Sequence, residues 1–292
     1  MMSLSGMRRR SLMVLAALMA VGGPVLADEV KPVDASRLVT VGGAVTEIVF
    51  DLGLGDKVIA RDMTSSFPEA VNALPDIGYM RALSPEGVLS VNPSAILMIE
   101  GSGPKETLDV LTKASVPLVT IPEGYDRDGI IRKILTIGKA LDADAKARAL
   151  ADKVAAEVDA AVADAAKVPE SQRKRVLFVL TVQNGKIMAA GGHTAADGIL
   201  KLAGAVNATG DFHGYKPLND EAVIEAKPDV ILMMMHGGPG VSDEELLANP
   251  AIALTPAGKD RRIVRMSSLT LLGFGPRTAE AIRKLSQELY GG

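Results

Sequence analysis

The sequence contains no cysteine and no tryptophan, and aromatic residues make up only 3% of it. A chain without cysteine has no disulfide, no thiolate metal ligand and no cysteine nucleophile. With so few aromatic side chains, the core must be mainly aliphatic. Each of the four tyrosines is therefore conspicuous, and its position needs a physical reason.

Histidines and catalytic motifs are equally sparse. The three histidines are His193, His213 and His236, and no two of them have the four-residue spacing of a helical zinc motif. The segments GGAVTE and GFGPR are glycine turns, but they match neither a phosphate-binding loop nor a dinucleotide fingerprint. No GxSxG nucleophile elbow occurs. We therefore expect neither an enzyme nor a dedicated zinc protein.

The chain also lacks an excess of basic residues, and its formal net charge is −3. Arg8, Arg9 and Arg10 precede the short apolar segment SLMVLAALMAVGG, and VLA follows, ending at Ala27. This order is typical of a cleavable secretory signal, and the segment is too short for a stable membrane anchor. Loss of residues 1–27 removes three arginines and no acidic residue, which takes the net charge to −6. We expect a mildly acidic exported protein with no nucleic-acid partner; an uncleaved anchor is the alternative.

What the chain does contain is a regular alternation of β-rich runs and helical segments. In the first half, strands are expected at 37–41, 57–60, 95–99 and 117–121, and helices near 46–55, 84–91, 105–114 and 128–140. In the second half, strands are expected at 174–180, 186–190, 229–235 and 261–266, and helices near 194–204, 219–226 and 276–289. Such alternation predicts βα units and mostly parallel sheets covered by helices on both faces.

One segment, 142–168, predicts a single long helix. It contains neither glycine nor proline, and an apolar residue recurs at every fourth position: Leu150, Val154, Val158 and Val162. Pro169 would end this helix. At about 1.5 Å per residue, the helix would span roughly 40 Å. Such a length is suited to joining two lobes, which we place at 28–141 and 169–292.

A repeated segment also indicates two lobes. The sequence LSPEGVLSVNPSAILM at 83–98 matches LNDEAVIEAKPDVILM at 218–233 with a constant offset of 135 residues. Both copies follow a Gly-Tyr pair and carry a glutamate at the same place: Gly78-Tyr79 with Glu86, and Gly214-Tyr215 with Glu221. These pairs favour a duplicated lobe over a chance similarity of two helix–proline–strand units. A ligand would then bind in a cleft between the lobes.

Four segments carry a family resemblance: GGAVTEIVFDLG, GYMRALSPEGVLSVNPSAIL, AAGGHTAADGILKLAG and LLGFGPR. With the signal, the lobes and the long helix, they resemble the bacterial haem transport binding proteins. These belong to the periplasmic binding proteins that serve metal-chelate ABC importers. The resemblance covers essentially the whole mature chain. It implies an α/β fold of two Rossmann-like lobes with mostly parallel sheets, joined by a single long helix as in class III periplasmic binding proteins.

The resemblance also implies a compartment, the periplasm, and a function. The protein would capture ferric haem, an iron protoporphyrin IX, in the cleft between its lobes. It would deliver the haem to the permease and ATPase of an inner-membrane ABC transporter, with an outer-membrane haem receptor upstream. The lobe architecture alone fits a carrier of a ferric siderophore or of cobalamin equally well. An exported enzyme on the same scaffold is a further alternative, although no catalytic pair is visible.

Within this family, the resemblance implies that Tyr79 is the axial ligand of the haem iron. A phenolate is a hard oxygen donor suited to ferric iron, but a free tyrosine has a pKa of about 10. The ferric ion favours the phenolate, and the guanidinium of Arg81 would either support the phenolate or pair with a haem propionate. Without the resemblance, composition favours a different interpretation, in which Tyr79 is a loop side chain packed at the sheet edge.

Four other residues are expected in the haem pocket: Met80, Tyr215, His193 and His236. Methionine and tyrosine offer apolar surface to a porphyrin. Some members of the family add a histidine ligand in the turn after the first strand of the second lobe. This chain has Gln183 there, so ligation by both tyrosine and histidine at that position is in doubt.

Glu86 and Glu221 occupy matching positions on the two lobes. In the family that the chain resembles, one glutamate on each lobe docks to arginines of the transporter permease. The resemblance therefore implies that these two residues contact the transporter. The alternative is that each glutamate only stabilises the start of its helix through the helix dipole.

Overall fold

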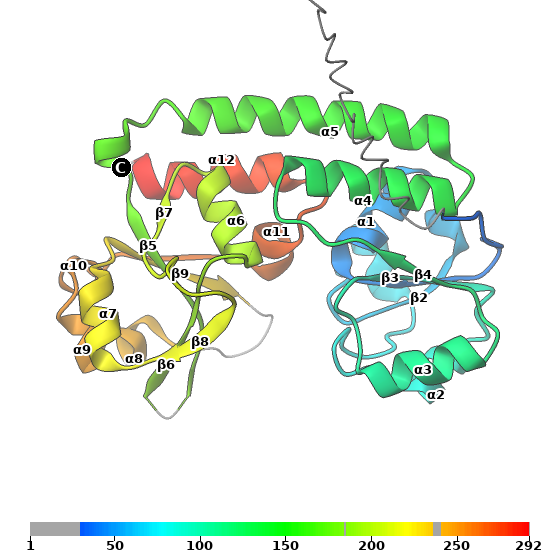
Figure 1. Cartoon of the computed structure of the whole chain (residues 1–292), viewed down its shortest axis with the longest axis horizontal. Helices are drawn as coiled ribbons and strands as arrows, with labels where there is room; N and C mark the ends of the chain where they lie inside the picture. The colour runs from blue at the N-terminus through cyan, green and yellow to red at the C-terminus, as the bar shows by residue number, and fades with distance from the viewer. Residues whose placement is uncertain (1–29, 184, 236–240, 292) are drawn as a thin grey trace, which may run out of the picture.

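The computed structural model describes residues 30–183, 185–235 and 241–291. The expected signal segment, residues 1–27, lies outside these ranges. The described chain forms two α/β lobes side by side, with long helices running along one edge of both (Figure 1). No helix in these ranges is long and apolar enough to cross a membrane.

The N-terminal lobe is built on a parallel sheet of four strands in the order β2-β1-β3-β4. The strands are β1 (Leu38–Val41), β2 (Val58–Arg61), β3 (Ala95–Ile99) and β4 (Leu118–Ile121). Every residue of β1 and β3 is buried, which explains why both strands are continuous apolar runs in the sequence. The expected bounds of these four strands agree with the structure to within one residue.

Helices cover both faces of this sheet. One face packs against α1 (Gly43–Asp51) and α4 (Arg127–Ala140), and the other against α2 (Pro85–Leu89) and α3 (Lys105–Lys113). Short 3₁₀ turns, η1 (Gly55–Lys57) and η2 (Glu69–Ala73), complete the lobe. In β3, Leu97 belongs to the first cluster and Ile96 to the second, because successive strand residues point to opposite faces.

The C-terminal lobe contains a mixed sheet of six strands, with the order β10-β9-β5-β6-β8 and with β7 paired to β5. The strands are β5 (Arg175–Gln183), β6 (Lys186–Ala190), β7 (Val206–Asn207), β8 (Tyr215–Leu218), β9 (Val230–Met235) and β10 (Ile263–Ser267). Strands β6 and β8 are antiparallel to their neighbours, and the other pairs are parallel. Only two residues separate β5 from β6, and so short a connection permits only an antiparallel hairpin.

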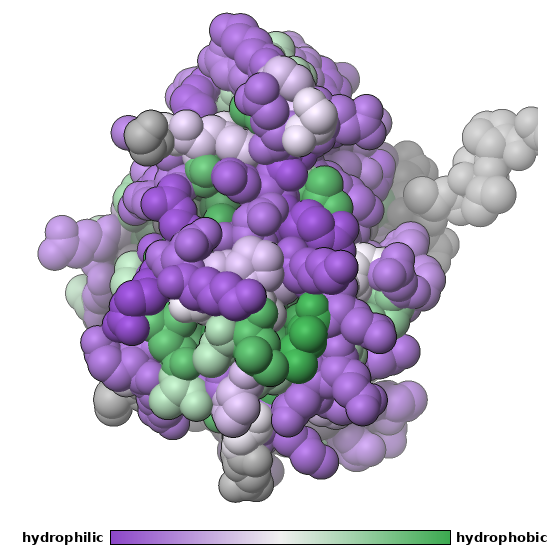
Figure 2. Space-filling view, turned by 90° about the vertical axis from the view of Figure 1, so that its left-hand side faces the viewer, coloured by the Kyte–Doolittle hydropathy of each residue, from purple (hydrophilic) through white to green (hydrophobic). Residues whose placement is uncertain are grey.

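The helices of this lobe are η3 (Glu170–Gln172), α6 (Ala195–Leu202), α7 (Asp220–Ala226), α8 (Asp243–Leu247), α9 (Pro250–Ala253), α10 (Pro256–Lys259), α11 (Ser268–Leu272) and α12 (Thr278–Tyr290). The sequence pattern indicated α6, α7 and α12 but not the others. Helices α8 to α11 are too short to produce a helical period. The end of the lobe that faces away from the N-terminal lobe is mainly hydrophilic, with apolar residues gathered in its lower half (Figure 2).

The two copies of the repeated segment form the same structural unit. Helix α2 and strand β3 correspond to α7 and β9, and β3 and β9 each pair with the first strand of their sheet. The helix caps are equivalent too. Ser84 Oγ accepts from the Gly87 amide at 2.9 Å. Asn219 Oδ1 likewise accepts from the Ala222 amide at 2.9 Å. The offset of 135 residues is therefore a structural as well as a sequence equivalence.

Helix α5 (Asp144–Ala165) connects the lobes and lies inside the expected segment 142–168. It crosses both lobes and packs on α4 of one and α12 of the other (Figure 1). Its buried side chains are Ala147, Ala151, Val154, Val158, Ala161 and Ala165. The expected stripe was partly wrong, because Leu150 and Val162 are only half-buried and alanines take their place. Small alanine side chains let the neighbouring helices approach closely. The lobe bounds 28–141 and 169–292 stay a prediction.

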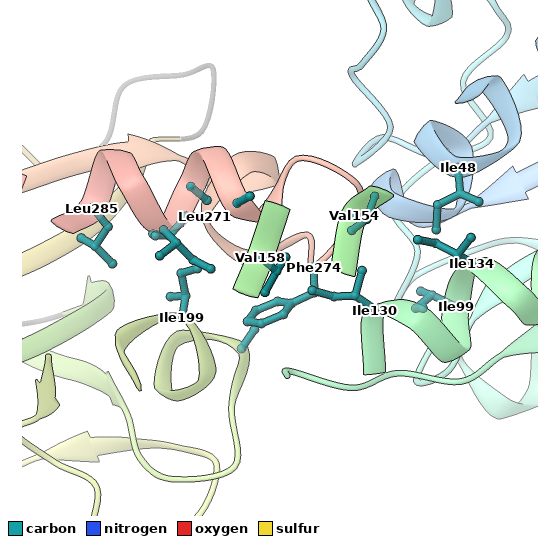
Figure 3. Close-up of a cluster of buried hydrophobic side chains, with 14 of the residues drawn as sticks. Ile48, Ile99, Ile130, Ile134, Val154, Val158, Ile199, Leu271, Phe274 and Leu285 are labelled. Carbon is teal, nitrogen blue, oxygen red and sulfur yellow. The ribbon is translucent and has the colours of Figure 1, made fainter. Parts of the chain in front are cut away.

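One hydrophobic core continues through both lobes (Figure 3). It contains Ile48 and Ile134 of the N-terminal lobe, Val154 and Val158 of α5, and Ile199, Leu271 and Leu285 of the C-terminal lobe. Phe274 lies between the two sets. Two smaller clusters lie beneath α2 and α3, and beneath α7 and α9. The lobes are therefore joined by packed apolar side chains as well as by the connecting helix α5.

Candidate functional site

Tyr79 lies in the loop that leads into α2, and 39% of its surface is exposed. It follows Gly78, whose φ of +100° is rarely adopted by residues with a side chain. On the other side, the Gly103 amide donates to the Met80 carbonyl at 2.9 Å, and the Leu83 amide donates to the Gly103 carbonyl at 3.0 Å. The Tyr79 hydroxyl has no hydrogen-bond partner among the described residues. An ordered loop thus carries a tyrosine whose hydroxyl is not used in protein contacts among the described residues.

Tyr215 of β8, in the C-terminal lobe, interacts electrostatically with Tyr79 and Arg81 of this loop. Although 37% of its surface is exposed, burial by the surrounding protein raises the pKa of its phenol; Arg81 partly offsets this rise and Tyr79 adds to it. Burial also raises the pKa of Tyr125, with contributions from Glu123 and Tyr215, whereas Arg81 lowers it. These interactions link Tyr79 and Arg81 of the N-terminal lobe, Tyr125, and Tyr215 of the C-terminal lobe within electrostatic range, and we call the four residues the interlobe cluster.

Arg81 is the one cation of the interlobe cluster. Its side chain is exposed and forms neither an ion pair nor a hydrogen bond with any residue that the structure describes. A guanidinium without a carboxylate partner is well suited to bind an anionic group of a ligand through paired hydrogen bonds. The cluster thus combines three phenols with one unpaired positive charge.

Tyr125 is the member of the cluster that sequence reasoning missed. It lies between β4 and α4, and its ring packs edge-on against Phe274, with 5.4 Å between ring centroids and an interplanar angle of 63°. Two signals pointed to it. The chain has only four tyrosines, and this one follows the carboxyl end of a parallel strand, where α/β proteins bind ligands.

Two histidines of the C-terminal lobe stack on each other near the cluster. The rings of His193 and His213 lie 4.4 Å apart with an interplanar angle of 18°. His193 has a φ of +59°, and its amide donates to Asp197 Oδ2 at 3.2 Å. Sequence reasoning selected His193 but not its partner. The third candidate, His236, lies outside the described residues. No group of three or more histidine or acidic side chains in the described ranges could hold a metal ion.

The methionines divide between core and surface. Met80, expected in the pocket, is half-buried and packs against two hydrophobic clusters, so only part of its side chain is accessible. Met233 is buried, whereas Met235 at the end of β9 is exposed. Met63 is also exposed, and its amide donates to the carbonyl of Gly78, next to Tyr79, at 2.9 Å. Met63 and Met235 are therefore the more accessible thioethers.

Glu86 and Glu221 lie in the first turns of α2 and α7, and both are exposed. Neither has an ion-pair partner in the described part of the chain. Their equivalent places on the two lobes follow from the equivalent caps of the helices. Both carboxylates are thus available to a partner protein, and both also lie where a helix dipole favours negative charge.

A separate broad hollow lies along α12. It is lined by charged and polar residues that include Arg262, Glu280, Arg283 and Gln287. The hollow contains no aromatic side chain and receives no residue from the N-terminal lobe. A planar ligand would find no stacking surface there, so we place the candidate ligand site at the interlobe cluster.

Two solved structures are similar over nearly the whole chain. The periplasmic heme-binding protein RhuT from Roseiflexus sp. RS-1, in its apo form, is 38% identical with a TM-score of 0.83, over 88% of this chain and 98% of that one. The periplasmic heme-binding protein BhuT, in complex with two hemes, is 38% identical with a TM-score of 0.81, over 87% of this chain and 97% of that one.

Curated relatives are more distant. An uncharacterized ABC transporter substrate-binding lipoprotein of Bacillus subtilis is 24% identical over 91% of this chain and 86% of its own length. A vitamin B12-binding protein of Yersinia pestis is 25% identical over 68% of this chain and 69% of its own length. Residues 38–269 match the family described as periplasmic binding protein. The chain, with its two α/β lobes and interlobe cluster, thus belongs to the periplasmic binding protein family.

Proposed function

We propose that the protein captures ferric haem between its two lobes and delivers it to an ABC importer of the inner membrane. The observation that carries the proposal is the interlobe cluster, in which Tyr79 and Arg81 of one lobe interact electrostatically with Tyr215 of the other. Two relatives of 38% identity are heme-binding proteins, which favours haem over other metal chelates. Members of this family bind and transfer ligands, and a transport role requires no catalytic group.

Tyr79 is the proposed axial ligand of the haem iron. Its hydroxyl has no protein partner in the described residues, and the loop around it is held in place on both sides. Ferric iron would withdraw charge from the phenol and so favour the phenolate at neutral pH. Tyr215 and Tyr125 are less suited to that role, because burial raises the pKa of both phenols. They would instead contact the porphyrin faces or edges.

Arg81 is the proposed partner of a haem propionate. It lies near Tyr125 and Tyr215, and its guanidinium fork matches the geometry of a carboxylate. Support of the Tyr79 phenolate is the other role that its position permits. His193 and Met80 complete the proposed pocket, and the stack with His213 would hold the imidazole of His193 at its rim.

The proposal extends to location and partners. Cleavage after Ala27 would release a periplasmic protein made of lobes 28–141 and 169–292. Glu86 and Glu221 would contact the transporter permease, whose ATPase drives import, and an outer-membrane haem receptor would supply the ligand. The periplasmic binding protein family and the substrate-binding lipoprotein relative are consistent with this arrangement.

A carrier of another metal chelate, a ferric siderophore or cobalamin, is the second candidate. The similarity to vitamin B12-binding proteins favours it, although that identity is only 25%. The two candidate ligands differ in whether their metal needs Tyr79 as a ligand. A chelate whose metal is already fully coordinated needs no phenolate ligand, whereas haem iron offers open axial positions.

A hemin titration tests the proposal. Wild type should give a Soret band that saturates with added hemin, and Tyr79→Ala should bind more weakly with an altered spectrum. Tyr290→Phe is the matched control, because its hydroxyl donates to the Gly204 carbonyl in the C-terminal lobe at 2.8 Å. Identical spectra and affinities for wild type and Tyr79→Ala would refute the ligand assignment. Failure of wild type to bind hemin, together with binding of cobalamin or a ferric siderophore, would favour the second candidate.

A further inference from the structure

The segment before Tyr79 is attached to the free edge of the N-terminal sheet. Strand β2 ends that sheet, and its last residue, Arg61, forms a parallel bridge with Asp76. The Arg61 amide donates to the Pro75 carbonyl at 3.0 Å, and the Ile77 amide donates to the Arg61 carbonyl at 3.0 Å. The chain is thus paired with the last residue of β2 just before it reaches Tyr79.

The carboxylate of Asp76 accepts two hydrogen bonds, one from the side chain of Arg61 and one from the backbone of Gly78. Its Oδ2 accepts a hydrogen bond from Arg61 Nη1 at 2.8 Å, which anchors the side chain to β2. Its Oδ1 accepts from the amide of Gly78 at 2.8 Å. Hydrogen bonds to a charged carboxylate are stronger than neutral ones. Asp76 therefore ties the residue immediately before Tyr79 to the sheet.

Gly78 is the point at which the chain turns toward the interlobe cluster. Its φ is +100°, and a Cβ added to it would meet no atom within 4 Å. The glycine is therefore required by backbone conformation and not by lack of space. The amide that Asp76 holds lies in the peptide between Ile77 and Gly78. The carbonyl of Gly78, in the next peptide, accepts from the Met63 amide. The two bonds thus fix the peptides on both sides of Gly78, the second of which leads to Tyr79.

The loop after β2, which holds Gly78 through the Met63 amide, is itself rigid. Met63, whose amide binds the Gly78 carbonyl, follows the fully buried Asp62. The Asp62 carboxylate accepts from the Gly42 amide, from the amide and hydroxyl of Thr64, and from the Ser65 hydroxyl, at 2.6 to 2.9 Å. Four donors on one buried carboxylate leave the loop after β2 little freedom to move.

We infer that Asp76 is a positioning residue for Tyr79, which directs the phenol into the interlobe space by holding the Gly78 amide. The inference rests on the proposed role of Tyr79 as haem ligand. Asp76 touches no ligand in this scheme. Its effect passes through the backbone of Gly78, and Arg61 contributes by holding the carboxylate in place.

Three variants separate this role from general stability. Asp76→Ala removes both contacts, whereas Asp76→Asn keeps an oxygen that can accept from the Gly78 amide. Gly78→Ala changes only the backbone preference, since its added methyl meets nothing. Asp159→Ala is the matched control. Asp159 also pairs with an arginine, Arg127, at 2.7 Å, but it lies on α5 and not in the segment that leads to Tyr79.

We expect Asp76→Ala to weaken hemin binding about tenfold or more, the effect of losing one charge-assisted hydrogen bond. Gly78→Ala should weaken it by a similar factor, because a residue with a side chain disfavours the φ of +100°. Their ferric spectra should move toward that of Tyr79→Phe. Asp76→Asn should largely restore both affinity and spectrum, and Asp159→Ala should match wild type. In the ligand-free protein, hydrogen exchange of the Gly78 amide should speed up in Asp76→Ala but not in Asp159→Ala. Circular dichroism establishes that each variant is folded, and Gly78→Ala carries the test if Asp76→Ala does not fold.

Two results would overturn the inference in distinguishable ways. If Tyr79→Phe alters the spectrum but Asp76→Ala and Gly78→Ala do not, Asp76 is not a positioning residue and the ligand assignment stands. If Tyr79→Phe leaves the spectrum unchanged, the ligand assignment fails and the inference fails with it.

Discussion

Arg277 of the C-terminal lobe forms a bidentate ion pair with Glu47 of the N-terminal lobe through two parallel hydrogen bonds. Nε donates to Oε1 and Nη2 donates to Oε2, each at 3.0 Å. Glu47 is only 3% exposed, and the guanidinium also covers the ring of Phe67, 3.7 Å from its centroid. This pair links the C-terminal lobe to α1 of the N-terminal lobe, in addition to the connection through α5.

Replacement of Arg277 by methionine should lower the free energy of unfolding by about 3 kcal/mol, because it leaves the Glu47 carboxylate buried without a partner. Arg265→Met is a close control. The side chains of Arg265 and Arg277 are equally exposed, at 26%, but the partner of Arg265, Asp243, is itself exposed. Loss of an exposed pair should cost less than about 1 kcal/mol. Urea unfolding measures both, and equal losses would contradict a special role for Arg277.

Glu47 should also give the stability of the protein a pH dependence. Burial raises the pKa of its carboxyl above the ordinary value of 4.5; Arg277 opposes the rise and Asp51 adds to it. Between 4.5 and the raised value, the folded state keeps a proton that the unfolded state has lost. The free energy of unfolding contributed by Glu47 must therefore fall as pH rises through this window.

Comparison with Glu47→Gln, which cannot titrate, isolates this contribution. The free energy of unfolding of wild type minus that of the variant should decrease from pH 4.5 upward and then level off. Urea unfolding at half-unit pH intervals measures the difference. A difference that is constant or that rises with pH would show that Glu47 is not protonated more readily in the folded state.

The role of Arg81 can be tested with a modified ligand. If Arg81 pairs with a propionate, Arg81→Met should weaken hemin binding about tenfold, the loss of a charge-assisted contact. The same change should have little effect on hemin dimethyl ester, which has no carboxylate. Equal losses with both ligands would assign Arg81 to the Tyr79 phenolate instead. Absorbance titrations of wild type and variant with each ligand provide the four affinities.

The docking role of Glu86 and Glu221 predicts a separation of binding from transport. The double variant Glu86→Gln, Glu221→Gln should bind hemin like wild type but fail to stimulate the ATPase of the reconstituted transporter. Glu106→Gln is a suitable control, because Glu106 is likewise exposed in the first turn of its helix, α3. Normal stimulation by the double variant would leave only the helix-dipole role for both residues.

The sequence was most informative where local pattern decides structure. Buried parallel strands such as β3 are continuous apolar runs, so their bounds were predicted closely. The repeat likewise predicted the equivalent helix–strand units of the two lobes. The proposed ligand role of Tyr79 came from the family resemblance and stays a prediction, since no contact in the protein tests it.

Contacts between distant parts of the chain could not be predicted in the same way. Arg277 belongs to the segment GFGPR, which by itself indicates only a glycine turn, and its partner Glu47 lies 230 residues away. The contacts of Lys133 could not be predicted from the sequence either. It lies in a helical pattern with nothing to mark it, yet its ammonium is fully buried and contacts Glu123 at 2.7 Å and the Phe274 carbonyl of the other lobe at 3.2 Å. Such pairs depend on how the lobes meet.

The core that passes from Ile48 through α5 to Leu285 also determines how the molecule comes apart. A protein made of two independently stable halves melts in two steps, each half retaining its own interior. Here, removal of either half would expose to solvent the apolar side chains that the other half buries against it. Calorimetry should therefore record one cooperative transition, and an isolated half expressed from either end of the gene should aggregate or stay unfolded.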